Sequence, residues 1–99
     1  MKTFSENCYN LLRKVPRGKI TTYKDLAHAM KSKAYRAVGT ALNKNPYAPQ
    51  VPCHRVINSD GRVGGFAAGT KKKIEILEKE GIPIKNGKVI DVEKYLYKF

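Results

Sequence analysis

The residues best suited to chemistry are Cys53 and His54, which stand side by side within residues 51–57. A cysteine attacks through its thiolate, and a neighbouring base or positive charge raises the thiolate fraction. His54 could act as the base, and either His54 or Arg55 could supply the charge. Pro52 restricts the backbone before the cysteine, which favours a fixed turn that presents one side chain. The alternative interpretation is a small core residue, because free cysteines are often buried.

The composition of the chain limits the classes of partner that it could bind. Its 99 residues suit one domain with one modest core, and they include 20 basic and 8 acidic side chains, a formal net charge of +12. This excess indicates an acidic partner, most simply nucleic acid, through phosphate neutralisation and counterion release. The alternative is a lysine-rich solvated surface. The sequence predicts no membrane span, because no apolar run approaches about 18 residues, and no signal peptide.

The two cysteines, Cys8 and Cys53, are far apart in the sequence and form no CxxC motif. This arrangement predicts no disulfide framework and favours a reducing compartment. Two cysteines and two histidines at these spacings match no zinc site. Cys8 belongs to a series of apolar residues at helical spacing, so we expect it in the core.

Three helices are predicted in the first half of the chain. Apolar residues recur at helical spacing over about residues 3–15, and this helix is expected to end before Pro16. Thr22 and Asp25 resemble a capping box, which predicts a helix of about two turns after Thr22. A slim helix of mostly small apolar residues is expected over about residues 34–44.

The second and third predicted helices, joined by a tight turn, are typical of a helix-turn-helix. In that motif the second helix meets the DNA bases, and Arg36 lies near its start. The alternative for Arg36 is an ordinary phosphate contact or a solvated charge.

Prolines and glycines in the middle of the chain indicate a connector, a turn and a loop. Three prolines predict a stiff, extended connector over residues 45–52. Residues 56–57 and 62–63 flank a turn signal with Asp60 and Gly61 at its tip, which predicts a strand-turn-strand unit. A loop of small residues follows at 64–69, where backbone N–H groups could approach a ligand.

The last third predicts one helix and one hairpin. Thr70 is expected to cap a helix over about residues 71–80, which Gly81 ends. An Asn-Gly pair predicts a β-hairpin over residues 82–90, and this basic hairpin could serve as a wing. Residues 91–99 fit a short packed helix or a strand equally well.

These elements together predict a mainly helical α/β fold. The expected architecture is a winged helix-turn-helix DNA-binding domain with small β-hairpins, and residues 1–99 are expected to form a single domain.

Five motifs stand in a fixed order along the chain: Arg36-Ala37-Val38-Gly39, Asn45-Pro46, Pro52-Cys53-His54-Arg55-Val56, Gly61-x-Val63-Gly64 and Glu80-Gly81. In this order they resemble the O6-alkylguanine-DNA alkyltransferases over roughly residues 3–86. The matching part is the family's C-terminal, DNA-binding and active-site domain. Many members carry an additional N-terminal domain, which is expected to be absent here.

The resemblance implies direct-reversal DNA repair with Cys53 as the acceptor. A nucleotide carrying O6-alkylguanine is flipped out of duplex DNA, and its alkyl group passes irreversibly to Cys53 in a single turnover. His54 would act as base through a water, and Glu80 would orient His54. Asn45 would support the active-site turn. Tyr23 would donate a proton towards the guanine ring nitrogen and help to rotate the nucleotide.

The resemblance also implies a set of DNA and substrate contacts. Arg36 would fill the gap that the flipped base leaves in the stack. Main-chain groups and the small-residue loop would line the base pocket. The residues implied in substrate and DNA binding are Arg36, Ala37, Tyr23, Val56, Phe66, Ala67 and Thr22.

The implied enzyme is a methylated-DNA–[protein]-cysteine S-methyltransferase that is consumed in its own reaction, because a thioether has no easy return path. The implied reaction needs no cofactor and no metal. The implied partner is double-stranded DNA containing O6-alkylguanine. A monomer without membrane attachment is expected, either cytoplasmic and nucleoid-associated or, in a eukaryote, nuclear.

Three other functions compete with this one. An alkyltransferase-like damage sensor binds the flipped base without transfer, although such proteins typically replace the cysteine that is present here. A winged-helix transcription regulator would leave the Cys-His pair unexplained. A cysteine hydrolase would need a distant histidine and an oxyanion loop, which the sequence does not reveal.

Overall fold

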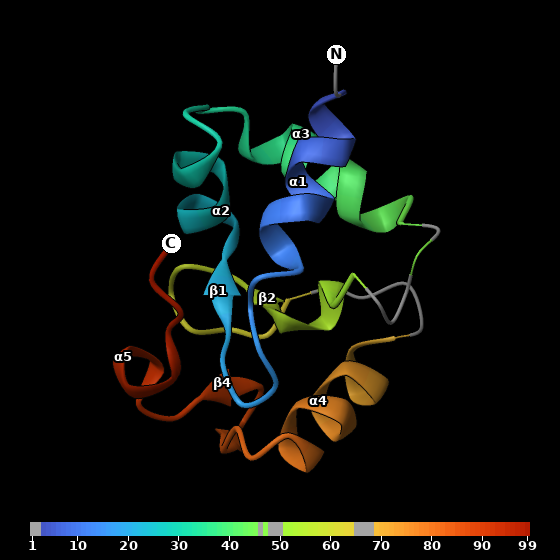
Figure 1. Ribbon diagram of the computed structural model, residues 1–99. Helices are drawn as coiled ribbons and strands as arrows, with labels where there is room; N and C mark the ends of the chain where they lie inside the picture. The colour runs from blue at the N-terminus through green and yellow to red at the C-terminus, as the bar shows by residue number, and fades with distance from the viewer. Residues whose placement is uncertain (1–2, 46, 48–50, 65–68) are drawn as a thin grey trace.

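The molecule has two halves, a helical one and a smaller mixed one, in a computed structural model that describes residues 3–45, 47, 51–64 and 69–99. The helical half lies in the upper part of Figure 1 and contains α1 (Phe4–Leu12), α2 (Tyr23–Ala29) and α3 (Tyr35–Asn43). The three predicted helices are therefore confirmed.

Helix α1 is shorter than predicted. Its last turn tightens, because the N–H groups of Lys14 and Val15 bond to carbonyls only three residues back. Val15 precedes Pro16, and the residue before a proline is disfavoured in helical conformation. The helix accordingly ends at Leu12 rather than near residue 15.

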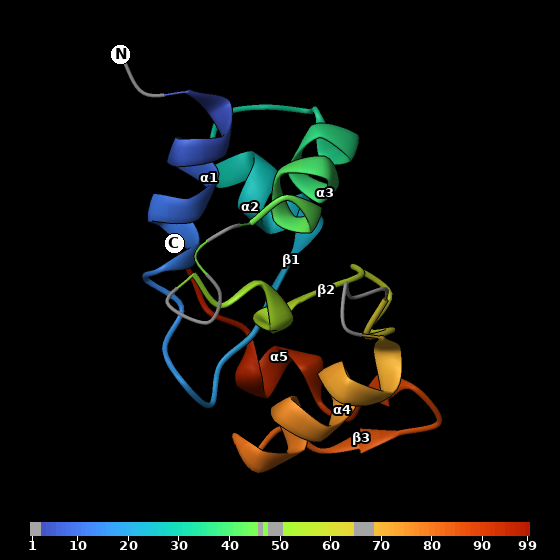
Figure 2. The ribbon, with the colours of Figure 1, turned by 90° about the vertical axis from the view of Figure 1, so that its right-hand side faces the viewer.

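Helices α2 and α3 form the predicted helix-turn-helix. The Thr22 hydroxyl accepts a hydrogen bond from the Asp25 N–H at 3.0 Å, so the predicted cap of α2 is confirmed. Lys31 adopts a positive φ of 56° in the turn that follows α2, and α3 then begins at Tyr35. Figure 2 shows α3 and α2 beside each other above the mixed half.

The three helices enclose the upper core, which also receives side chains from the segment around the Cys-His turn. Cys8 is fully buried in it, as expected. The buried residues of the upper core are Cys8, Tyr9, Leu12, Val15, Leu26, Ala27, Val38, Ala41, Leu42, Val51 and Val56.

A parallel strand pair joins the two halves. Strand β1 (Thr21–Thr22) pairs with β2 (Val56–Ile57), with Thr21 opposite Val56. The 3₁₀ turn η1 (Cys53–Arg55) comes directly before β2, so the Cys-His pair lies where the halves meet (Figure 2).

The predicted strand-turn-strand unit over residues 56–63 is confirmed in its first strand and its turn, but its two strands do not pair with each other. The turn itself forms, because the Asn58 N–H donates to the Arg62 carbonyl at 2.9 Å. Both residues of β2 are fully buried, and their ladder partner is β1. Arg62 instead forms an isolated antiparallel bridge with Lys88. A buried strand between two cores thus takes a distant partner rather than its sequence neighbour.

The mixed half contains a helix packed on a hairpin. It consists of α4 (Thr70–Lys79), β3 (Ile84–Lys85), β4 (Lys88–Val89) and α5 (Val92–Tyr95). Strands β3 and β4 pair antiparallel through Asn86 and Gly87, both at positive φ, so the predicted hairpin is confirmed. The buried residues of this lower core are Ile20, Ile57, Val63, Leu77, Ile82 and Val89.

The predicted start of α4 is wrong, and its predicted end is confirmed. Gly69, at φ 100°, precedes the helix, so the expected Thr70 cap is wrong and Thr70 is its first residue. A positive φ suits glycine and not threonine. Gly81 lies at φ 90° after the helix, and the Ile82 N–H bonds back to the Leu77 carbonyl, which confirms the predicted stop.

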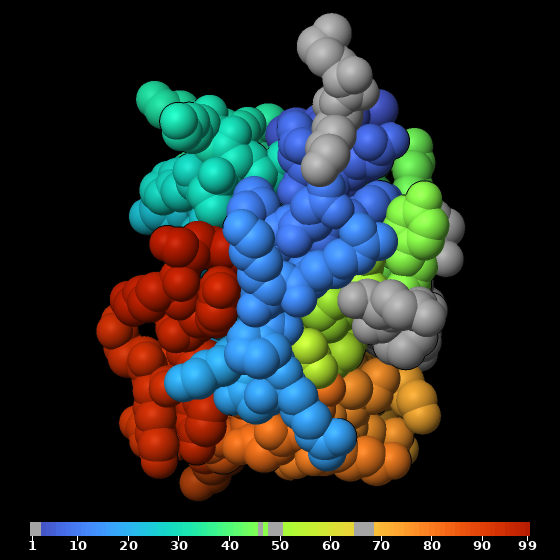
Figure 3. Space-filling view, in the orientation of Figure 1, coloured from blue at the N-terminus to red at the C-terminus, as the bar shows by residue number. Residues whose placement is uncertain are grey.

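The C-terminal tail contains both structures that the sequence left open. After the short helix α5, Leu96 forms a parallel bridge with Ile20. In Figure 3 the segment after α1 runs down the front of the molecule, with the C-terminal tail on one side and α4 on the other. Within the described residues, no helix has the length and apolar character to cross a bilayer. The fold is mainly helical α/β, as predicted.

Candidate active site

The turn η1 presents Cys53 and withdraws His54. The Arg55 N–H donates to the Pro52 carbonyl at 3.0 Å, and the Val56 N–H returns to the Cys53 carbonyl, so the turn is closed at both ends. Cys53 is half-buried against the upper core, whereas His54 is only 6% exposed. The thiol therefore stands at the boundary between protein and solvent.

Asn45 braces the approach to this turn. Its side-chain Nδ2 donates to the Val51 carbonyl at 2.9 Å, and its Oδ1 accepts the Tyr47 N–H at 2.9 Å. The Val51 carbonyl also accepts the Cys53 N–H at 2.9 Å. One amide thus ties the end of α3 to the residue two before the cysteine, which limits how the turn can move.

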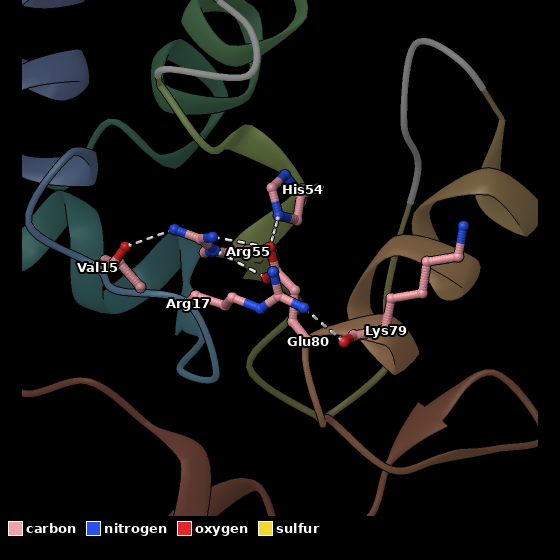
Figure 4. A network of polar contacts seen from close by, with 6 residues as sticks. All are labelled: Val15, Arg17, His54, Arg55, Lys79 and Glu80. Atoms are coloured by element: carbon pink, nitrogen blue, oxygen red, sulfur yellow. Dashed lines mark hydrogen bonds and ion pairs between the residues drawn. The ribbon is translucent and has the colours of Figure 1, made fainter.

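Glu80 connects His54 with Arg55. His54 Nε2 lies 3.1 Å from Glu80 Oε2. Arg55 donates to both carboxylate oxygens, from Nε to Oε1 at 2.9 Å and from Nη2 to Oε2 at 2.7 Å, while its Nη1 donates to the Val15 carbonyl at 2.9 Å. Figure 4 shows the carboxylate between the two side chains, with Arg17 reaching the Lys79 carbonyl beside them.

The charges in this network follow from burial and contact. Burial lowers the pKa of His54, and the hydrogen bond with Glu80 only partly opposes that effect. Burial raises the pKa of Glu80, but hydrogen bonds from Arg55 and His54 outweigh it and hold that pKa below its usual value. At neutral pH the site therefore contains a carboxylate and a neutral imidazole.

These charge states determine the tautomer of His54. A carboxylate can only accept hydrogen bonds, so Nε2 must carry the hydrogen that lies between the ring and Glu80. Nδ1 is then the unprotonated nitrogen, on the opposite edge of the ring. This histidine can accept a proton, and the Glu80 carboxylate stabilises the imidazolium that results.

Tyr23, the first residue of α2, packs half-buried beside the same core residues as Cys53. Burial, and then the charge of Cys53, raises the pKa of Tyr23, so its hydroxyl keeps its proton at neutral pH. A cavity of about 510 Å³ opens beside it. The cavity is lined by Tyr23, Lys24, Tyr35, Asn58, Ser59 and Asp60.

The other residues predicted to bind DNA or substrate differ in how far they are exposed to solvent. Arg36 is exposed at the start of α3, and Ala37 behind it is half-buried. Thr22 is buried and its hydroxyl caps α2. Val56 is fully buried, and its carbonyl accepts a hydrogen bond at 2.6 Å from Lys73 Nζ. Phe66 and Ala67 lie outside the described residues.

Two residues of the site were not predicted. Arg55 was predicted only as a possible positive charge beside the cysteine. In the structure its guanidinium donates two hydrogen bonds to the Glu80 carboxylate. Lys73 went unnoticed on a helix rich in lysine, although it is only 1% exposed. Its position four residues before the core residue Leu77 places it on the buried face of α4, and that spacing was the available signal.

The described residues contain no group of three or more His, Cys, Asp or Glu side chains that could hold a metal ion.

Comparisons with known proteins point to one family. The model described as "6-O-methylguanine DNA methyltransferase, DNA binding domain" matches residues 3–82. A methylated-DNA–protein-cysteine methyltransferase of Methanosarcina barkeri is 45% identical over 78 residues, 78% of this chain and 49% of that protein. A bifunctional methyltransferase/endonuclease of Picrophilus torridus is 44% identical over 90 residues, 90% of this chain and 30% of that protein. The chain thus spans half or less of these two relatives.

Two solved structures are also similar to this chain over most of its length. Atl1 of S. pombe, in complex with damaged DNA containing O6-carboxymethylguanine, superposes with a TM-score of 0.86 at 30% identity over the whole of both chains. The O6-methylguanine-DNA methyltransferase of Pyrococcus kodakaraensis superposes with a TM-score of 0.75 at 42% identity, covering 83% of this chain and 48% of that one.

Proposed function

Because the chain belongs to the 6-O-methylguanine DNA methyltransferase family through its DNA-binding domain, we propose that it is a direct-reversal repair protein whose Cys53 accepts the alkyl group of O6-alkylguanine. The observation that carries this proposal is the contact of 3.1 Å between His54 and Glu80, directly beside a half-buried cysteine. A merely structural cysteine would need neither a neutral imidazole nor a carboxylate to orient it.

The first step is deprotonation of the thiol. Nδ1 of His54 takes the Cys53 proton through a water, and Glu80 stabilises the imidazolium through Nε2. Arg55 keeps Glu80 ionised and in place with two hydrogen bonds. Asn45 holds the turn, so the sulfur meets its target in a defined direction.

The second step is displacement at a saturated carbon. The Cys53 sulfur forms a bond with the alkyl carbon while the bond from that carbon to O6 breaks, and the electron pair passes into the guanine ring. Tyr23 donates its proton to the ring nitrogen, and the raised pKa of Tyr23 keeps that proton available until the purine becomes basic. The product is a thioether on Cys53, so each molecule acts once.

The third component is DNA binding. An O6-alkylguanine must leave the duplex to reach the sulfur, at a cost of about a few kcal/mol. Arg36, which is exposed on α3, would enter the stack behind it, and the net charge of +12 would supply phosphate contacts. We carry over Val56, Ala37, Thr22, Phe66 and Ala67 from the family resemblance as further contacts to the DNA or to the flipped base. Residues 1–99 would form one DNA-binding and active-site domain that acts as a monomer and uses no cofactor.

A second candidate function is damage sensing without transfer. It is favoured by the end-to-end match with Atl1, a structure in complex with damaged DNA. Sensing requires the same flipped base and the same Arg36, but it requires no nucleophile. The presence of Cys53 in the turn is therefore the feature that favours repair over sensing.

Peptide mass mapping separates the two functions. The protein is incubated with duplex DNA containing O6-methylguanine and then digested. We expect the Cys53 peptide to gain one methylene mass, with the Cys8 peptide unchanged as an internal control, since Cys8 is fully buried. Duplex DNA without the lesion should modify neither peptide. Tight binding of the lesion with both peptides unmodified would support sensing instead.

A further inference from the structure

Tyr47 is an aromatic residue in the connector between α3 and the turn η1. It is 48% exposed, yet its ring lies against two side chains of α1. The ring meets that of Tyr9 edge to face, with the centroids 5.7 Å apart, and the guanidinium carbon of Arg13 lies 5.6 Å from the Tyr47 centroid. Edge-to-face pairs and cation–π contacts stabilise beyond the area that they bury. Tyr47 is therefore held against α1 although half of its surface is open to solvent.

The two residues that contact the Tyr47 ring are themselves held in place. Tyr9 is only 6% exposed, and its hydroxyl donates to the Ala41 carbonyl in α3 at 2.7 Å. Arg13 Nη1 donates to Asn10 Oδ1 in α1 at 2.8 Å. Neither side chain can turn away without losing a hydrogen bond. The Tyr47 ring thus packs on a surface that is fixed to both α1 and α3.

The main chain of Tyr47 is connected to Cys53 by hydrogen bonds. The Tyr47 carbonyl accepts the Val51 N–H at 3.0 Å, and the Val51 carbonyl accepts the Cys53 N–H at 2.9 Å. Asn45 bonds to both ends of this unit, since Oδ1 accepts the Tyr47 N–H and Nδ2 donates to the Val51 carbonyl. Displacement at a saturated carbon needs the sulfur aligned with the bond that breaks. A shift of Tyr47 would therefore change the direction of the Cys53 sulfur.

We propose that Tyr47 is a positioning residue of the alkyl transfer, because its contacts with Tyr9 and Arg13, here called the Tyr47 clamp, fix the direction in which η1 presents Cys53. This inference rests on the proposed function. It gives α1 a part in a reaction to which α1 contributes no reacting group. Asn45 ties the turn to the end of α3, and the Tyr47 clamp adds a second tie, to α1.

Two pairs of variants separate the Tyr47 clamp from general effects. Tyr47→Phe keeps the ring and both of its contacts, whereas Tyr47→Ala removes them. Arg13→Met removes the charge beside the ring, and Lys14→Met removes a charge from the next, equally solvent-facing position as the matched control. All four variants should fold, because the three substituted residues are exposed and such substitutions rarely unfold a domain.

The expected result is slower transfer by a thiol of unchanged reactivity. With saturating duplex DNA containing O6-methylguanine, single-turnover transfer should fall about tenfold in Tyr47→Ala and about threefold in Arg13→Met. Tyr47→Phe and Lys14→Met should match the wild type. Alkylation of Cys53 by iodoacetamide, a small reagent that needs no fixed approach, should not change in any of the four. Normal transfer in Tyr47→Ala, or an equal loss in both reactions, would overturn the proposal.

Hydrogen exchange tests the Tyr47 clamp without DNA. The Cys53 N–H is bonded to the Val51 carbonyl, so a looser connector should expose it to solvent more often. In Tyr47→Ala the Cys53 amide should exchange about tenfold faster than in the wild type. The Ile82 amide, bonded to the Leu77 carbonyl in the lower half, should not change. An unchanged Cys53 amide would contradict the proposal. Faster exchange in Tyr47→Ala, with no transfer by the wild type, would contradict the proposed function and leave the clamp intact.

Discussion

At the scale of single residues, the site assigns different tasks to two adjacent side chains. His54 is buried and neutral, and Arg55 is charged and committed to Glu80. From the resemblance, the sequence predicted His54 as a base with Glu80 as its partner, two side chains that lie 3.1 Å apart. The sequence did not predict the two hydrogen bonds from Arg55 to Glu80, because residues 25 positions apart meet only through the tertiary fold.

Glu80→Gln should slow transfer and weaken the fold at once. The variant keeps the volume of the side chain but removes the charge that stabilises the imidazolium, so we expect transfer to fall about 100-fold. It also leaves Arg55 without its ion pair, at a cost of about 3 kcal/mol in the free energy of unfolding. Single-turnover kinetics and urea unfolding measure the two effects. Glu78→Gln, on the exposed face of α4, is the control, and an equal loss there would refute the assignment.

The lowered pKa of His54 makes a prediction about acid stability. Between the folded pKa and the ordinary value of 6.5, the unfolded chain binds a proton that the folded chain does not. The free energy of unfolding should therefore fall as the pH drops below about 6.5. Glu80 adds a further loss at lower pH, as the pH falls through its depressed pKa. In His54→Gln the first part of the decline should disappear, which urea unfolding at a series of pH values can measure.

At the scale of secondary structure, local signals predicted the elements that depend on local contacts. The Thr22 cap, the helix-turn-helix and the Asn86-Gly87 turn each involve residues close together in the sequence. The β1–β2 pair joins residues 35 positions apart, and no local pattern identifies which partner a buried strand takes. The fully buried strand β2 was therefore placed in a wrong hairpin.

Helix α3 should act through Arg36 in duplex DNA. If Arg36 replaces the flipped base in the stack, Arg36→Ala loses a contact that only duplex substrate needs. We expect transfer from duplex DNA to fall about tenfold or more relative to transfer from single-stranded DNA of the same sequence. Lys33→Ala removes an exposed charge just before α3 and should lower both rates equally. If Arg36→Ala lowers transfer from duplex and from single-stranded DNA by the same factor, Arg36 makes only a phosphate contact.

At the scale of the whole molecule, two small cores meet at the Cys-His turn. The upper core supports the helix-turn-helix, and the lower core supports α4 and the hairpin. Glu80 and Lys73 come from the lower half, where Glu80 contacts His54 in η1 and Lys73 contacts Val56 at the start of β2. The composition predicted a nucleic-acid partner, but only the fold shows that the site takes its parts from both halves.

The net charge of +12 predicts a strong effect of salt on DNA binding. Each phosphate contact releases counterions, so affinity for duplex DNA should fall steeply and linearly on a log-log plot as salt rises. Reaction of Cys53 with iodoacetamide, a neutral reagent, should change little over the same range. Fluorescence anisotropy and mass spectrometry provide the two readouts. A flat binding response would mean that the basic surface has no role in DNA binding.

The most direct test of the central claim is a titration of the protein with duplex DNA whose O6-methylguanine carries a radiolabelled methyl group. The account predicts that label moves from DNA to protein until one methyl per chain is bound, that it resides on Cys53, and that a second addition of substrate transfers no more. Label that stays in the DNA while the protein remains bound to it, or transfer that Cys53→Ser leaves unchanged, would contradict the account.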